Sequence, residues 1–119
     1  MAVQPLYVET LVSRIPDLST ADEVYFRVPS DGVVEAVYTV IHNAITSADA
    51  TVTVKQTGSA TATLGTITVT QSGSAAADVD SLSLDTAVVA GDLIEVETNG
   101  GSSTACPTTV HLQLRKLTR

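Results

Sequence analysis

The segment from Glu23 to Ile41, EVYFRVPSDGVVEAVYTVI, constrains the fold most, because a turn sequence separates two apolar stretches of strand character. Every second residue from 24 to 28 is apolar, which is the pattern of a half-buried strand. Residues 33–41 are apolar on nearly both faces, so this strand is expected in the middle of a packed sheet. The intervening Pro29-Ser30-Asp31-Gly32 predicts a hairpin, because glycine tolerates positive φ and aspartate can bond nearby backbone.

The rest of the chain repeats this alternation of apolar and polar residues, with turn sequences about every ten residues. Gly65 lies inside one of the apolar stretches and predicts a bulge or bend there. The pattern predicts an all-β fold, an antiparallel β-sandwich of jelly-roll type with about eight strands. The expected strands are 6–15, 24–28, 33–41, 50–55, 64–69, 82–85, 93–98 and 107–117, and 71–80 is expected to be an exposed loop.

Length and composition agree with a single β domain. A chain of 119 residues is long enough for one domain with a core that needs no disulfide or metal. Valine and threonine are abundant and favour pleated, half-buried surfaces over helices. We therefore expect one sandwich domain over residues 1–119, with an N-terminal arm at 1–5 and a basic tail at 115–119.

Charge and cysteine content narrow the function. The formal net charge is −7, and an acidic surface repels phosphate backbones and anionic membranes, so nucleic acid and membrane are not expected as partners. Cys106 is the single cysteine, which excludes an intrachain disulfide and is expected to be an unreactive thiol. The N-terminus lacks the pattern of a signal peptide, and no apolar run is long enough to cross a bilayer.

Two groups of residues were considered as metal sites. Asp78, Asp80 and Asp85 offer the oxygen ligands that calcium prefers, but the surrounding sequence lacks the glycine and terminal glutamate of a twelve-residue calcium loop. His42 and His111 have no nearby histidine or cysteine that would complete a zinc site. A solvated acidic loop explains the aspartates, and no metal or other cofactor is expected.

Catalysis has equally little support in the sequence. Glu95 and Glu97 share one face of a strand and could in principle cleave glycosides, although carboxylates on a solvated strand do the same. No serine–histidine–aspartate arrangement follows from the spacing. We expect no catalytic residues, and the protein is not expected to be an enzyme.

The two ends of the chain are the candidate contact regions. Three of the six basic residues lie in the last five positions, where they form either a solvated tail or a segment that docks onto an acidic partner. The N-terminal arm could likewise reach a second protein. The nominated contact residues are Met1, Ala2, Val3, Gln4, Pro5, Leu6, Tyr7, Arg115, Lys116 and Arg119.

Three segments resemble short virion proteins of tailed bacteriophages, known as head decoration or cement proteins. They are DEVYFRVPSDGVVEAVYTV at 22–40, ADATVTVK at 48–55 and VVAGDLIEVETNGG at 88–101. The resemblance implies a protein on the outer surface of an expanded head, which bridges major capsid subunits, commonly as a homotrimer. It also implies synthesis in the host cytoplasm and residence in the virion. The family has no active-site motif, so no site residue is carried over.

The alternative interpretation is a carbohydrate- or receptor-binding module of a phage tail or fibre. Jelly rolls often serve such roles, but a fold does not decide a function. The four aromatic residues, Tyr7, Tyr25, Phe26 and Tyr38, are few for sugar stacking, and some are expected in the core.

Overall fold

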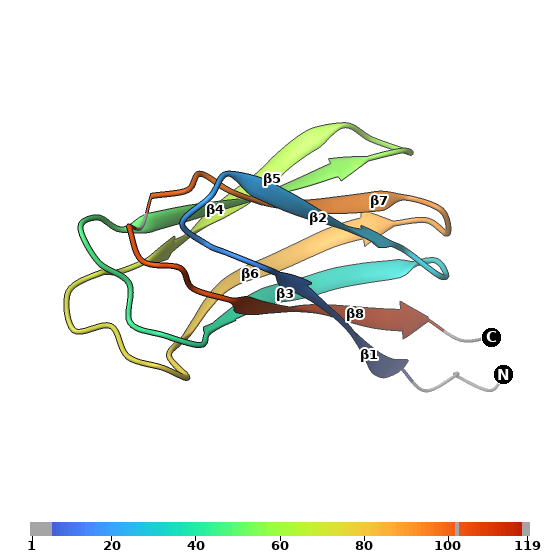
Figure 1. Ribbon diagram of the computed structural model, residues 1–119. Coiled ribbons are helices and arrows are strands. Elements are labelled where there is room, and N and C mark those ends of the chain that lie inside the picture. The colour runs from blue at the N-terminus through green and yellow to red at the C-terminus, as the bar shows by residue number, and fades with distance from the viewer. Residues whose placement is uncertain (1–5, 102, 118–119) are drawn as a thin grey trace, which may run out of the picture.

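The chain folds into two four-stranded antiparallel sheets packed face to face (Figure 1). The computed structural model describes residues 6–101 and 103–117. Sheet A has the order β1 (Leu6–Ile15), β8 (Thr108–Leu117), β3 (Gly32–Ile41) and β6 (Val79–Val88). Sheet B has the order β2 (Asp22–Arg27), β7 (Leu93–Thr98), β4 (Ala50–Thr57) and β5 (Ala62–Val69). This strand order is that of a jelly roll, so the predicted sandwich is confirmed.

In the described part of the chain, no helix is long and apolar enough to cross a membrane.

The core lies between the sheets and follows the alternation in the sequence. One side chain of each pair along β4, β7 and β8 points inward and is buried, as the period of two requires. The inward side chains of these strands are Ala50, Val52 and Val54, then Ile94 and Val96, then Val110, Leu112 and Leu114, each 0% exposed.

The predicted hairpin between the first two apolar stretches is wrong. β2 pairs with β7 in sheet B, whereas β3 lies between β8 and β6 in sheet A, so the chain crosses from one sheet to the other. Val28 directs this crossing, because its N–H donates to the Asp92 carbonyl and its carbonyl accepts from Gly91 N–H, both at 2.8 Å. The expected interior position of β3 is confirmed.

The turn residues also act differently from the prediction. The Asp31 carboxylate accepts a hydrogen bond from the Ala90 N–H at 3.0 Å, far away in sequence. At Gly32 a Cβ atom would lie 2.4 Å from the Arg115 carbonyl oxygen. Glycine is therefore required at position 32 by the close approach of β8.

Two bulges interrupt the sheets. The predicted bulge at Gly65 is confirmed by a shift in the β4–β5 register, where Val54 faces Gly65 and Lys55 faces Thr63. A second bulge shifts β3 against both neighbours between Val34 and Ala36.

Two boundaries differ from the sequence-based prediction. β6 begins at Val79 instead of residue 82, because its outward residues are small and polar and hide the alternation. Arg115 and Lys116 belong to β8 and so do not form a separate tail. The predicted arm at 1–5 and the last two residues lie outside the described residues.

Candidate functional site

The beginning of β1 and the end of β8 form one corner of the sandwich. In their antiparallel pairing, Leu6 lies opposite Leu117 and Tyr7 lies opposite Lys116. The two terminal segments nominated as contact regions therefore meet at one place, which their separation in sequence did not predict. Of the nominated residues, Met1 to Pro5 and Arg119 lie outside the described part of the chain.

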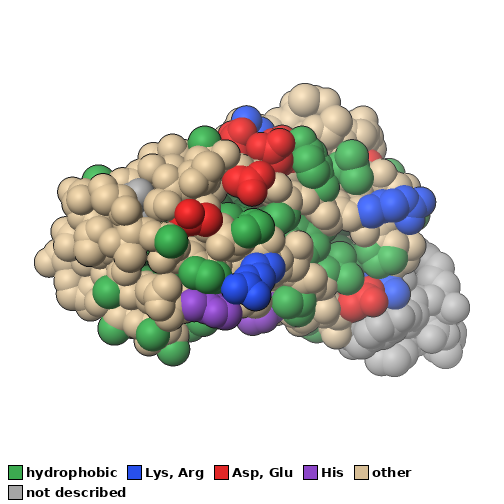
Figure 2. Space-filling model, in the orientation of Figure 1, with side chains coloured by type: hydrophobic (Ala, Val, Ile, Leu, Met, Phe, Trp, Pro, Cys, Tyr) green, Lys and Arg blue, Asp and Glu red, His purple; other side chains and the backbone are tan. Residues whose placement is uncertain are grey.

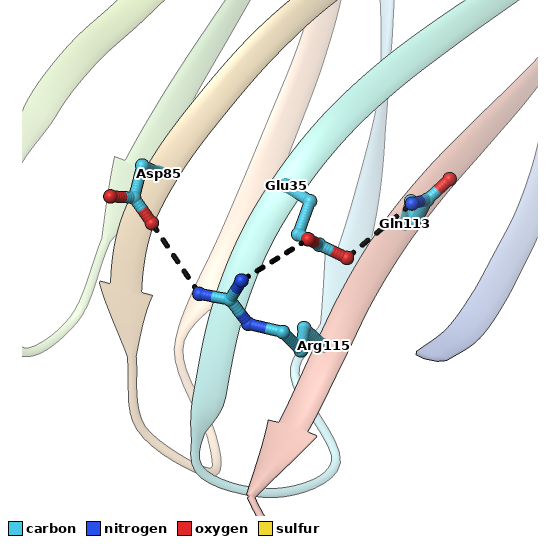
Figure 3. A network of polar contacts seen from close by, with 4 residues as sticks. All are labelled: Glu35, Asp85, Gln113 and Arg115. Carbon is cyan, nitrogen blue, oxygen red and sulfur yellow. Dashed lines mark hydrogen bonds and ion pairs between the residues drawn. The ribbon is translucent and has the colours of Figure 1, made fainter. Parts of the chain in front are cut away.

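Arg115 is the centre of a polar network on the outer face of sheet A (Figure 3). Its Nη1 lies 3.4 Å from Glu35 Oε2, and its Nη2 lies 3.6 Å from Asp85 Oδ1. Gln113 donates from Nε2 to the other Glu35 oxygen at 3.4 Å. The network connects β8 with β3 and β6, so the guanidinium already has acidic partners within its own chain.

Lys116 also has an acidic partner within the chain. Its Nζ lies 3.4 Å from Glu9 Oε1 on β1, and the lysine side chain is 19% exposed. This ion pair joins the edge strand β1 to β8. Both described basic residues of the predicted docking tail are thus part of the folded sheet.

Carboxylates gather on the outer face of sheet B (Figure 2, red). In the β2–β7 pairing, Glu23 lies directly opposite Glu97. One carboxylate oxygen from each of Glu23, Glu95 and Glu97 lies within 4.8 Å of the others. Such a group has the oxygen ligands that a divalent cation takes, although solvated carboxylates on a strand surface need none. The alternation predicted Glu95 and Glu97 on this face, and the strand pairing adds Glu23.

Two neighbouring groups respond to this negative charge. The charge of Glu95, followed by burial, raises the pKa of Tyr25 above its ordinary value. Lys55 donates from Nζ to Glu97 Oε1 at 3.2 Å, and this hydrogen bond is the main cause that raises the pKa of the lysine. The face therefore combines an exposed tyrosine, three carboxylates and one lysine.

The three aspartates considered for calcium do not converge. Asp78 accepts a hydrogen bond from Ala75 N–H at 2.9 Å within its own loop, while Asp85 pairs with Arg115. Burial, followed by the charge of Asp78, raises the pKa of Asp80. Within residues 6–101 and 103–117, the only group of three possible metal ligands is the one on sheet B.

The histidines and the cysteine also lie apart from one another in function. His42 Nε2 lies 2.8 Å from Thr109 Oγ1, whereas His111 lies in β8 between Val12 and Tyr38. Cys106 is fully buried, and its Sγ lies 3.4 Å from the Asn43 carbonyl oxygen. The arrangement is that of a packed thiol close to the start of β8.

Asp92 is a buried polar residue whose importance the sequence did not reveal. Its carboxylate accepts hydrogen bonds from Ser59 N–H at 2.8 Å, Ser59 Oγ at 2.7 Å, Val89 N–H at 3.1 Å and Gln56 Nε2 at 3.2 Å. These bonds, led by the Ser59 amide, lower the pKa of Asp92 to about 2. Asp92 joins the β4–β5 turn to the β6–β7 turn, and Val89–Asp92 read only as an ordinary turn sequence.

Exposed apolar side chains lie on the outer face of sheet A. Val8 is 51% exposed and Val12 is 61% exposed on β1, and Val79 on β6 is 59% exposed. Figure 2 shows hydrophobic side chains on this side of the molecule, interspersed with charged ones. No alternating pattern in the sequence said which valines of β1 would face solvent.

Comparisons with known proteins establish the fold and leave the family open. No protein-family model matches the chain, and no curated protein matches it at a significant level. A chain of the cyanophage Pam1 capsid structure matches with TM-score 0.56 and 19% identity, over 92% of this chain and 84% of that one.

Two other solved structures are similar to a comparable degree. A chain of the Helicobacter pylori bacteriophage KHP30 capsid matches with TM-score 0.54 and 10% identity, over 89% of this chain and 94% of that one. The module CsCBM6-3 from Clostridium stercorarium, solved with cellobiose, matches with TM-score 0.51 and 12% identity, over 98% and 88%. At these identities the similarity concerns the fold alone, which phage capsid structures and carbohydrate-binding modules share.

Proposed function

We propose that this protein is a decoration or cement protein, which binds the outer surface of a tailed-phage head and bridges its major capsid subunits. The observation that carries the proposal is the corner where β1 begins opposite the end of β8. Both terminal segments nominated as contacts lead from this corner, so they can act on one partner together. Similarity of fold to two phage capsid structures supports the same role.

The physical basis of the function is multivalency. A single bridging contact between subunits can be weak, since many contacts held at fixed geometry on a shell give a large avidity. We expect the protein to act as a homotrimer at three-fold positions, as the resemblance implies. The net charge of −7 suits a protein that stays away from the packaged DNA.

Co-sedimentation with heads that lack the protein tests the proposal. The purified protein should bind saturably, at a fixed ratio to the major capsid protein, and light scattering should give the mass of a trimer. Absence of binding to such heads would refute the decoration role, whatever the mass.

The terminal corner can be tested separately from the fold. A variant lacking Met1 to Pro5 should keep the Tm of the intact protein but bind heads at least about tenfold more weakly, a loss of about 1.4 kcal/mol. A matched control is Val79→Thr, which changes an exposed side chain on the opposite edge of sheet A. Full binding by the truncated protein would remove the arm from the mechanism.

Carbohydrate binding is a second candidate, and the outer face of sheet B favours it. Tyr25 is 56% exposed there and lies opposite Glu95, so an aromatic ring and carboxylate acceptors are neighbours. On this hypothesis a glycan array should give binders that Tyr25→Ala abolishes. Binding that survives the loss of the ring, or an array without binders, would exclude a site on this face.

A further inference from the structure

The sandwich has four edge strands, and β1 differs from the other three. β1 and β6 are the edges of sheet A, and β2 and β5 are those of sheet B. β2 has only 6 residues, and the pairings of β5 and β6 each contain a register shift. β1 has 10 residues that pair with β8 without a shift. Short length and bulges are the usual protections against pairing with another chain, and β1 lacks both.

The outer side chains of β1 reinforce this difference. Val8 and Val12 are more than half exposed, and Thr10 lies between them on the same face. Arg14 is the single charged residue on this face of the strand, at its far end. Glu9 points the other way and is neutralised by Lys116 at 3.4 Å. A regular strand edge is therefore bordered by a surface that has an apolar centre.

We propose that β1 pairs antiparallel with β1 of a second copy, about a two-fold axis that passes at Thr10. This register places Val8 of each copy opposite Val12 of the other and the two Thr10 residues opposite each other. Apolar and threonine pairs of this kind stabilise antiparallel strands. The two copies of sheet A would form one continuous eight-stranded sheet, through an isologous contact.

Neighbouring registers are less favourable. An axis at Glu9 places two carboxylates directly opposite each other, and like charges in that position destabilise a strand pair. An axis at Leu11 places Val8 opposite Arg14. Self-complementarity of the strand about Thr10 is the reason to assign the edge to a second copy and not to a strand of another protein. The proposal does not depend on capsid binding.

Disulfide cross-linking of the purified protein tests the register. Thr10→Cys should give a disulfide-linked dimer under mild oxidation, because directly opposed Cβ atoms lie about 5 Å apart, close to disulfide geometry. A mixture of Val8→Cys and Val12→Cys should give the mixed dimer. Arg14→Cys is the matched control, because its two copies would lie about 27 Å apart, eight residues along the strand. The native Cys106 is buried and should not react.

The cross-linking results decide between specific and random contact. Equal yields for Thr10→Cys and Arg14→Cys, or no dimer from Thr10→Cys, would overturn the proposal. Dimers that form in another pattern of positions would overturn the register.

Sedimentation at increasing concentration tests the contact without cysteines. Val12→Lys should abolish the concentration-dependent association, because it places two charges opposite the two Val8 side chains. Val79→Lys changes a valine of nearly equal exposure on the other edge strand of sheet A and should leave association intact. Intact protein that never associates, or loss of association only in Val79→Lys, would overturn the assignment of β1.

Discussion

The outer faces of the two sheets are built from the same alternation but treat charge in opposite ways. On sheet A, Arg115 lies between Glu35 and Asp85, so the charges are paired across three strands. On sheet B, Glu23, Glu95 and Glu97 gather, and Lys55 is the one cation with a contact to them within the described residues. One face is close to neutral with apolar borders, and the other is acidic.

The difference shows that strand order, and not composition, decides the character of a β surface. A charged residue on a strand is flanked by whatever its two neighbouring strands present in register. β8 lies between β1 and β3, so Arg115 meets Glu35, whereas β7 lies between β2 and β4, so Glu97 meets both Glu23 and the lysine-bearing strand. The neutral face suits a protein contact, and the acidic face suits solvent or a polar ligand.

The largest effect is expected at Asp92, which holds the two sheets in their relative position. Asp92→Ala leaves the Ser59, Val89 and Gln56 donors without their acceptor, and we expect Tm to fall on the order of 10 °C. Asp31→Ala is the control, because this exposed carboxylate accepts one hydrogen bond in the same region and should change Tm little. Calorimetry of both variants measures the difference, and equal values would contradict the role of Asp92.

The same carboxylate predicts the response of the protein to acid. The folded pKa of Asp92 is lowered from 3.8 to about 2, so its contribution is present above the unfolded value and is lost as pH falls through the folded one. Stability should therefore decline between pH 3.8 and about 2, and this part of the decline should be absent in Asp92→Asn. Unfolding in urea at a series of pH values measures it.

The next largest effect is expected on the neutral face. Arg115→Ala removes the cation that Glu35 and Asp85 share, and we expect a loss of about 1–2 kcal/mol in the free energy of unfolding. Arg115→Lys should recover part of the loss, because an ammonium keeps the charge but cannot bond both carboxylates as a planar fork does. Urea denaturation separates the three proteins, and an alanine variant as stable as the parent would show the network to be idle.

A smaller effect is expected on the acidic face. Lys55→Met removes the partner of Glu97, whose side chain is 38% exposed, and Tm should fall by less than about 2 °C. Arg27→Met makes the same charge change on this face of β2, opposite Leu93, and should have less effect. High salt should abolish the difference between the variants, since screening at about 1 M salt acts over about 3 Å. A difference that persists in salt would indicate a packing effect.

The smallest effect concerns the ionisation of Tyr25. Glu95→Gln should lower its raised pKa toward 10.0, whereas Glu35→Gln on sheet A should leave it unchanged. Because the folded pKa is raised, the tyrosine contributes stability below pH 10.0, and this is lost as pH rises through the folded value. Phenolate absorbance, with Tyr25→Phe to identify the signal, measures the pKa. Equal shifts in both glutamine variants would refute a local cause.

Much of the fold could be predicted because local alternation reports burial directly. The inward faces of β4, β7 and β8 agree with the pattern residue by residue, and Gly65 marks its bulge. The start of β6 was missed because serine and aspartate on an exposed edge give no contrast. The alternation also placed Glu95 and Glu97 on one face, but it had no means to add Glu23.

The sequence by itself determined the strands, their buried faces and the acidic balance, since these depend on residues close together in the chain. The tertiary structure decided which strands are neighbours. It separated β2 from β3, placed Arg115 and Lys116 against carboxylates and brought the two chain ends to one corner. It also left β1 as a long unprotected edge. The physical reason is that strand partners are chosen by packing between sheets over long separations, where the local alternation is the same for every possible order.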